Sequence, residues 1–489
     1  MNRHTRTLLL LLSAACSLAQ AQMPVAQADP AIAQALTQVS PTQIHDEIEK
    51  LVSFKNRSTL SSMDKDLPPG TGVNAAADWV FAEFTRISAA CGNCLEVKRD
   101  DYVEPASSTA NSRVTRNTRL QNIYAVLKGT DPAQANRRVL VTGHYDSRNS
   151  DNFNTHDPAP GANDDASGVA VSLESARVLS KLKFPATIVF VAVAGEEQGL
   201  YGSRHLAKLA RAEGWDLEAV LNNDIVGGDT TPGQTGQDKR AVRVFSEGVP
   251  GPTTPEQLRG IQTLGSESDS PSRELARAIL SVGQSYFLPT HPAPGGAICR
   301  RCQPFVAFHP VLIFRRDRFL RGGDHSSFNA EGFPAVRFTE WQENFDHQHQ
   351  TPRTEPGTLQ NGTSGPVEYG DFLKYVDFDY VANVARLNAA ALATFASAPG
   401  EPADVHILTK ALDNNTELTW KAPTGAPAGT TYEVLWRATD APSWTDVRSA
   451  GEALTLKLPI SKDNVVFAVR SLDRAGHRSP AVLPAPQPR

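Results

Sequence analysis

Short apolar runs alternate with amphipathic segments through most of the chain. The runs are rich in β-branched residues and short, so they predict strands buried in a sheet. They lie at residues 139–141, 188–194, 220–226, 311–314 and 335–338, with further strands expected at 95–103 and 122–127. Apolar residues recur at helical spacing at 44–52, 73–90, 169–182, 271–282 and 378–395. This alternation predicts an α/β fold with a mostly parallel central sheet flanked by helices.

The pattern changes after a Pro/Ala-rich joint at residues 398–402. Beyond the joint, apolar and polar residues alternate in short runs, as at Leu418/Trp420 and Val465/Phe467/Val469. Such runs predict a C-terminal all-β sandwich. We therefore expect one domain over residues 40–397 and a second over 403–486. Residues 229–310 are rich in Gly, Pro, Thr and Ser, and we expect them to be irregular apart from one helix opening at Ser270-Pro271.

Polar residues follow the apolar runs where strands should end. His144 and Asp146 follow the run at 139–141, Glu196 and Glu197 follow 188–194, and Asp224 lies near the end of the run at 220–226. Asp164 stands just before a predicted helix. The carboxyl ends of parallel strands meet at one edge of a sheet, where ligands bind in α/β folds. The sequence therefore predicts that these side chains share one crevice.

Charge and targeting patterns exclude several classes of function. The 489 residues carry a net charge of −5 without a basic run, so no nucleic-acid partner is expected. No apolar span of 18 residues occurs, and no transmembrane helix is expected. Residues 1–21 combine a basic start, an apolar core and an Ala19-Gln20-Ala21 cleavage site. We predict a signal peptide and a secreted or periplasmic protein.

The four cysteines beyond the signal peptide form two C-x-x-C pairs, Cys91/Cys94 and Cys299/Cys302. Such pairs occur in zinc knuckles, redox centres and disulfides, and an exported protein favours disulfides. The gap of about 200 residues fits no compact zinc finger. The connectivity stays open, and the simplest pairing closes Cys91–Cys94 and Cys299–Cys302.

The crevice residues are all nitrogen or oxygen ligands. His144, Asp164, Glu197, Asp224 and a late histidine suit Zn²⁺. Five ligands exceed the three that one catalytic zinc usually takes, so they suit two ions sharing a carboxylate. A further carboxylate must then accept a proton from the attacking water, and Glu196 is the natural choice.

The order of these motifs and the residues in them resemble those of the co-catalytic di-zinc aminopeptidase family. That family also contains carboxypeptidases, glutaminyl cyclases and non-catalytic receptor ectodomains. The resemblance covers about residues 40–397, and the tail resembles a fibronectin type III module. The matching motifs are GHYDS at 143–147, GANDDASG at 161–168, GEEQG at 195–199, ND at 223–224 and DHSSF at 324–328.

The resemblance implies a role for each residue of the crevice. His144 and Asp224 would hold one zinc, Glu197 and a late histidine the other, and Asp164 would bridge the two ions. Asp146 would orient His144, and Glu196 would be the general base. Aligning Asn344-Phe345 with the family's Asn-aromatic pair selects His349 as the late ligand, with His347 as the alternative.

The implied function is that of an exported metallo-aminopeptidase acting on peptides with a free N-terminus. A glutaminyl cyclase-like transferase and a non-catalytic binding or adhesion protein are the alternatives. The C-terminal module would bind a surface or polymer. Side-chain preference, and aminopeptidase as opposed to carboxypeptidase or dipeptidase action, do not follow from the motifs.

Overall fold

The computed structural model describes residues 23, 25–109, 111–289, 304–410 and 412–487. The predicted signal peptide at residues 1–21 and the Cys299/Cys302 pair lie outside these residues. No helix within the described ranges combines the length and apolar character needed to cross a bilayer.

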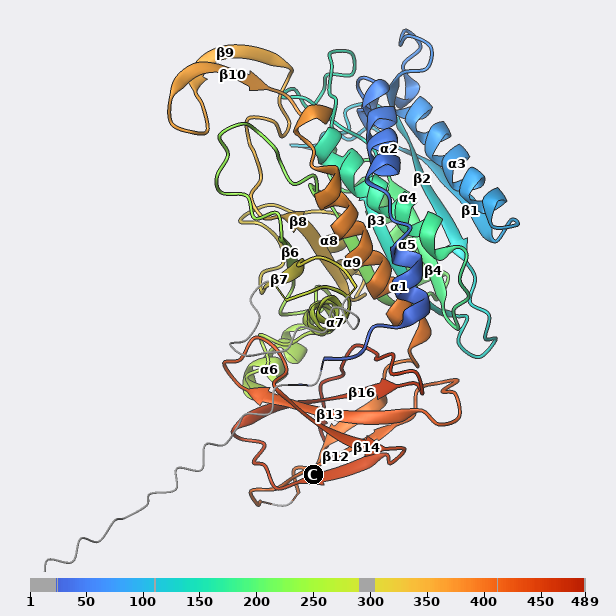
Figure 1. The fold of residues 1–489 in the computed structure, drawn as a ribbon, viewed down its shortest axis with the longest axis vertical. Helices are drawn as coiled ribbons and strands as arrows, with labels where there is room; N and C mark the ends of the chain where they lie inside the picture. Colours follow the sequence, from blue (N-terminus) through green and yellow to red (C-terminus); the bar gives the residue numbers. More distant parts are fainter. Residues whose placement is uncertain (1–22, 24, 110, 290–303, 411, 488–489) are drawn as a thin grey trace, which may run out of the picture.

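A central sheet organises the larger part of the molecule (Figure 1). Its strands lie in the order β1-β2-β4-β3-β5-β8-β6-β7. They span β1 Leu95–Glu104, β2 Thr118–Leu127, β3 Arg137–His144, β4 Thr187–Val193, β5 Asp216–Asn223, β6 Ala241–Ser246, β7 His309–Ile313 and β8 Ala335–Glu340. Pairing is parallel from β4 through β3 and β5 to β8, and also between β6 and β7. The pairs β1–β2, β2–β4 and β8–β6 are antiparallel. The predicted α/β class is confirmed.

Helices cover both faces of this sheet. Successive side chains along a strand point to opposite faces, so each strand contributes to two hydrophobic cores. On β3 and β4, Val139, Val141 and Phe190 enter one core, and Leu140 and Val189 enter the other. The first core is covered by α1 Pro30–Leu36, α2 Pro41–Ser53, α3 Gly72–Ala90, α4 Ser167–Leu179, α7 Pro271–Tyr286 and α9 Phe378–Ser397. The second is covered by α5 Tyr201–Ala212 and α8 His325–Ala330. Short helical turns lie at η1 Thr59–Met63, η2 Ala162–Ala166 and η3 Leu373–Tyr375.

The expectation that residues 229–310 hold a single helix is wrong. This region also contributes β6 to the sheet and forms α6 Pro255–Leu264. Helix α6 buries none of its residues, although Leu258, Ile261 and Leu264 recur at helical spacing. A hairpin of β9 Arg353–Thr358 and β10 Ser364–Tyr369 was likewise not expected. Its Pro356 and Pro366 are residues that strands disfavour.

The C-terminal residues form the predicted β-sandwich, which lies at one end of the sheet domain in Figure 1. One sheet has the order β15-β12-β11-β17 and the other β14-β13-β16. The strands are β11 Ala403–Ile407, β12 Thr416–Lys421, β13 Thr431–Ala438, β14 Asp446–Gly451, β15 Thr455–Leu458, β16 Val465–Leu472 and β17 Ala485–Pro486. Leu418, Trp420, Val434, Phe467 and Val469 form its core.

A buried ionic network joins the sandwich to α7. Arg437 of β13 pairs with Asp269, which also accepts from Arg277 at 2.9 Å. Trp444 donates its indole N–H to Glu274 Oε2 at 2.9 Å. Breaking a buried charge pair is costly, so this network holds the sandwich firmly against the larger domain.

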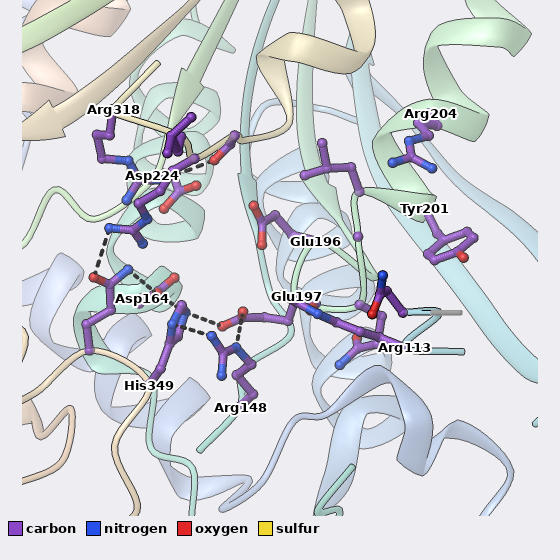
Figure 2. A pocket seen from close by; sticks show the side chains of 18 of the residues that line it. Arg113, Arg148, Asp164, Glu196, Glu197, Tyr201, Arg204, Asp224, Arg318 and His349 are labelled. Atoms are coloured by element: carbon purple, nitrogen blue, oxygen red, sulfur yellow. Dashed lines mark hydrogen bonds and ion pairs between the residues drawn. The ribbon is translucent and has the colours of Figure 1, made fainter. Parts of the chain in front are cut away.

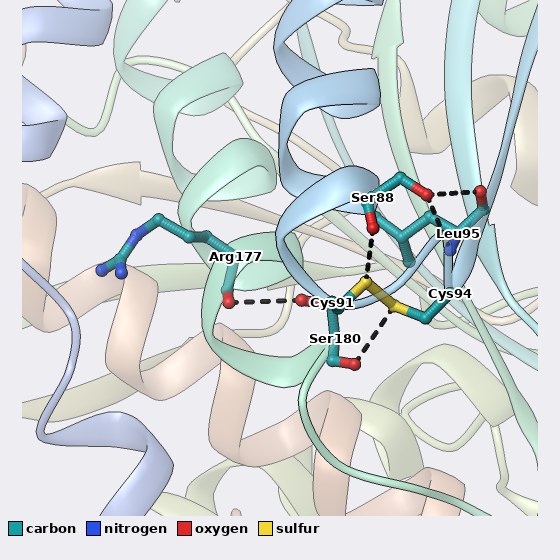
Figure 3. Close-up of a disulfide and its surroundings, with 6 residues drawn as sticks. All are labelled: Ser88, Cys91, Cys94, Leu95, Arg177 and Ser180. Carbon is teal, nitrogen blue, oxygen red and sulfur yellow. Dashed lines mark hydrogen bonds between the residues drawn. A yellow bond between two sulfur atoms is a disulfide. The ribbon is translucent and has the colours of Figure 1, made fainter.

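The predicted Cys91–Cys94 disulfide is confirmed and closes the turn between α3 and β1 (Figure 3). Beside it, the Ser88 hydroxyl donates to Leu95 O at 2.8 Å and accepts the Leu95 N–H at 3.1 Å. The turn that enters the sheet is therefore tied both covalently and by hydrogen bonds.

Candidate metal centre

The predicted ligands meet at the carboxyl end of the parallel strands. Figure 2 shows four of them, Asp164, Glu197, Asp224 and His349. His144 is the last residue of β3, Glu197 follows β4, and Asp224 follows β5. Asp164 lies in the η2 turn before α4, and His349 lies in the loop after β8. Each parallel strand ends at the same edge, which explains why residues 205 positions apart in the sequence share one site.

These ligands form two groups that share Asp164. In the first, His144 Nε2 lies 3.1 Å from Asp164 Oδ1 and 3.9 Å from Asp224 Oδ1. In the second, His349 Nε2 lies 2.8 Å from Asp164 Oδ2 and 3.2 Å from Glu197 Oε1. Within each group the ligand atoms all lie within 4.8 Å of one another.

The donor set fits divalent cations. His144 Nε2 and Glu197 Oε1 are buried and make no hydrogen bond in the described part of the chain. Three carboxylates packed around two imidazoles would repel one another without positive charge between them. Imidazole and carboxylate are ligands that zinc accepts.

Asp146 links His144 to the two glutamates. Its backbone oxygen and Oδ1 lie 3.2 and 3.4 Å from His144 Nδ1. The same carboxylate accepts the N–H groups of Glu196 at 3.4 Å and Glu197 at 3.2 Å. A hydrogen bond at Nδ1 leaves Nε2 of the imidazole to face the cluster.

Two buried carboxylates that the sequence analysis missed hold the Asp164 loop. Asp165 accepts from the N–H groups of His144 at 3.0 Å, Gly168 at 3.0 Å and Ile225 at 3.3 Å, so it joins the ends of β3 and β5 to the start of α4. Asp371 accepts the Asp164 N–H at 2.7 Å. Asp165 stood next to a predicted ligand in the sequence, whereas no sequence pattern marked Asp371.

A close approach at Gly168 also shapes this corner. A Cβ atom at this position would lie 2.2 Å from the backbone oxygen of Asn223. Only glycine therefore lets the start of α4 pack against the end of β5.

Each outer carboxylate of the cluster is paired with an arginine. Arg337 Nη1 lies 2.7 Å from Asp224 Oδ2, and Arg148 Nε lies 2.9 Å from Glu197 Oε2. Arg148 Nη2 also lies 2.5 Å from His349 Nδ1. These arginines offset part of the negative charge of the cluster, and no sequence pattern marked them.

The two late histidines lie in different surroundings. His349 faces Asp164 and Glu197, whereas His347 Nδ1 lies 3.3 Å from Asp229 Oδ1 and its ring stacks on Tyr375 at 4.1 Å. Between them, Gln348 donates to Asp164 Oδ2 at 3.1 Å. The geometry places His349, not His347, in the ligand cluster.

Glu196 points into a pocket of about 790 Å³ that also reaches Asp164, Asp224 and His349. Burial raises the pKa of Glu196 well above its ordinary value, and the charges of Asp224, Glu197 and Asp324 add to this rise.

Burial lowers the pKa of His349, but the negative charges of Glu197 and Asp164 outweigh this effect and raise that pKa to about 10. His325 donates its Nε2–H to the backbone oxygen of Arg316 at 2.8 Å and lies outside both ligand groups.

The histidines and carboxylates cluster at the strand ends of an α/β fold, beside a glutamate that faces the pocket. This arrangement is typical of a metalloenzyme. Residues 122–270 match the model of peptidase family M28. A protein of Pyricularia oryzae named "Probable zinc metalloprotease" is 42% identical over 472 residues, covering 95% of this chain and 86% of that protein. One of the same name from Pyrenophora teres f. teres is 41% identical over 452 residues, covering 92% and 86%. The chain belongs to peptidase family M28.

Solved structures were also found to be similar to the chain. The crystal structure of Legionella pneumophila LapA aminopeptidase is 18% identical, with a TM-score of 0.47 over 75% of this chain and 74% of that one. Glutaminyl cyclase of Porphyromonas gingivalis is 17% identical, with a TM-score of 0.42 over 72% of this chain and 97% of that one.

Proposed function

We propose that the protein is an exported zinc aminopeptidase that removes N-terminal residues from peptides. The observation that carries the proposal is the position of Asp164, whose two oxygens face His144 and His349 separately at 3.1 and 2.8 Å. This is the arrangement that two ions sharing one carboxylate need. Membership of peptidase family M28 supports peptide hydrolysis, and the names of the relatives support zinc.

The ligand roles follow from the two groups. His144 and Asp224 would hold one ion, Glu197 and His349 the other, and Asp164 would bridge them. When bound, zinc polarises the scissile carbonyl and lowers the pKa of the attacking water. Asp146 keeps His144 Nε2 directed at the cluster through its contacts with Nδ1.

Glu196 would move the proton. It lines the pocket beside the ligands, and its neighbour Glu197 is held by Arg148 and so is not free to serve. As general base, Glu196 takes a proton from the attacking water, and it then donates that proton to the departing amine.

Export is supported by the sequence of residues 1–21 and by the Cys91–Cys94 disulfide. Disulfides persist mainly in secreted and periplasmic proteins. The expected test is N-terminal sequencing of the mature protein from the medium or periplasm, with cleavage after Ala21. An intact Met1 in the recovered protein contradicts export.

The decisive assay compares a peptide carrying a free N-terminus with its N-acetylated twin. We expect loss of the first residue from the free peptide only, and loss of activity after metal removal with recovery on adding Zn²⁺. Equal cleavage of the acetylated twin, or activity that survives both demetallation and Glu196→Gln, contradicts the proposal. Conversion of N-terminal glutamine to pyroglutamate without shortening would instead support the cyclase alternative.

A further inference from the structure

The pocket beside the candidate metal centre is rich in arginine. Five arginines line it, at positions 113, 148, 204, 318 and 321. Its acidic lining residues are Asp164, Glu196, Glu197 and Asp224, all already assigned to metal binding or proton transfer. Leu200, Tyr201, Leu320 and Phe345 add apolar surface to the lining. The pocket therefore offers an approaching substrate guanidinium groups beside apolar surface.

Three of these arginines already have acidic partners. Arg148 pairs with Glu197 at 2.9 Å, and Arg318 and Arg321 pair with Glu343 at 2.8 and 2.7 Å. Each of these three guanidinium groups is therefore already engaged by a carboxylate of the protein.

Arg113 and Arg204 differ, because neither has an acidic partner within the described ranges. Half-buried Arg113 donates Nη1 to the backbone oxygen of Glu197 at 2.7 Å, which anchors its guanidinium beside the ligand cluster. Exposed Arg204, on α5, lies over the ring of Tyr201 at 5.6 Å from its centroid. Both guanidinium groups keep donors available for a ligand.

The two arginines lie on the same side of the pocket, with Tyr201 between them in Figure 2. Figure 2 places Arg113, Tyr201 and Arg204 across Glu196 from His349 and Asp164. A substrate group bound there lies next to the bond whose cleavage Glu196 would assist. A guanidinium group binds carboxylates through charge-assisted and often paired hydrogen bonds.

We propose that Arg113 and Arg204 form a subsite for a substrate carboxylate, so that the enzyme prefers peptides with a carboxylate near the scissile bond. The proposal rests on the peptidase function proposed above. The carboxylate has two possible sources, an Asp or Glu side chain and the free C-terminus of a very short peptide. Both present the same group to the two arginines.

Matched peptides separate these sources. A first pair, Leu-Glu-Ala-amide and Leu-Gln-Ala-amide, varies the side chain after the scissile bond. A second pair, Glu-Leu-Ala-amide and Gln-Leu-Ala-amide, varies the side chain before it. A third pair, Leu-Ala and Leu-Ala-amide, varies only the free C-terminus. We expect at least one acid to exceed its neutral partner about tenfold in kcat/KM, chiefly through a lower KM.

Variants then assign the preference. R113Q/R204Q should bring the favoured pair to nearly equal KM. Lys208→Gln is the matched control, because Lys208 is exposed on the same helix and does not line the pocket. It should keep the wild-type preference.

Two results overturn the subsite. In the first, the acidic and the neutral peptide of every pair are cleaved equally well. In the second, the preference for the acidic peptide persists unchanged in R113Q/R204Q. Failure to cleave any of the peptides overturns the proposed function instead. The subsite is then tested by titration calorimetry with all three peptide pairs on Glu196→Gln protein. Tighter binding of an acidic peptide that R113Q/R204Q abolishes supports the subsite, and equal binding within every pair contradicts it.

Discussion

Asp146 accepts the backbone N–H of Glu197 at 3.2 Å and thereby fastens the end of β3 to the end of β4. The contact holds two adjacent glutamates in different surroundings. Glu197 is buried and faces His349, whereas Glu196 is half-buried and faces the pocket. Two carboxylates of equal chemistry can therefore carry different roles.

Replacing Glu196 with glutamine tests this division. We expect Glu196→Gln to keep bound metal and to lose about 10²–10⁴-fold in kcat, because the amide cannot accept the proton. Metal analysis and steady-state kinetics measure the two effects. Glu197→Gln is the paired comparison and should lose metal. Equal metal loss in both variants would show that the two glutamates have the same role.

The assignment of the late ligand is tested by two histidine variants. His349→Gln should reduce the zinc content, because it removes the imidazole beside Asp164 and Glu197. His347→Gln should retain the metal, since His347 contacts Asp229 and Tyr375 instead. Equilibrium dialysis followed by elemental analysis gives the metal content per chain. The opposite ranking would make His347 the ligand.

Asp165 is expected to matter for stability even without metal. Both carboxylate oxygens of Asp165 accept backbone N–H groups in the wild type. In Asp165→Asn one of these oxygens is replaced by an NH₂ group, which cannot accept a hydrogen bond and leaves a backbone N–H without a partner. We expect a loss of about 2–4 kcal/mol in the free energy of unfolding. Denaturant unfolding of the chelated protein measures it, so that changes in metal affinity do not contribute. Asp216→Asn, at an exposed position on β5, is the control, and an equal loss there would contradict the explanation.

The interface with the sandwich should respond to pH through Glu274. Burial raises the pKa of Glu274 from 4.5 to about 6, and Asp269 adds to the rise against the opposing effect of Arg277. The folded state then binds more protons than the unfolded state between these values, so this contribution to stability falls as pH rises from 4.5 to 6.

Glu274→Gln lacks this proton equilibrium. We expect the unfolding free energy of the wild type, relative to this variant, to decrease by about 2 kcal/mol across that window. Denaturant titrations at several pH values measure the difference. Glu256→Gln on exposed α6 should follow the wild-type pH profile. A constant difference between wild type and Glu274→Gln would contradict the role of Glu274.

Much of the fold and the candidate ligands followed from local pattern. The apolar run before Gly195 marked β4, and the polar residues at the ends of β3, β4 and β5 were recognisable because parallel strands end at a common edge. The β9–β10 hairpin was missed because its strands contain proline and few apolar residues, and helix α6, which buries none of its residues, lies in a region rich in Gly, Pro, Thr and Ser.

The sequence by itself determined the α/β pattern, the C-terminal sandwich and the residue types available for a metal site. It did so because the spacing of apolar residues within a short segment is enough to predict a buried strand or an amphipathic helix. The resemblance already favoured His349 over His347, but only the tertiary structure showed His349 beside Asp164 and brought Arg148, Arg337 and Asp371 to the cluster. These contacts join segments up to about 200 residues apart, and a pairing across such distances depends on how the chain closes in space rather than on any local pattern.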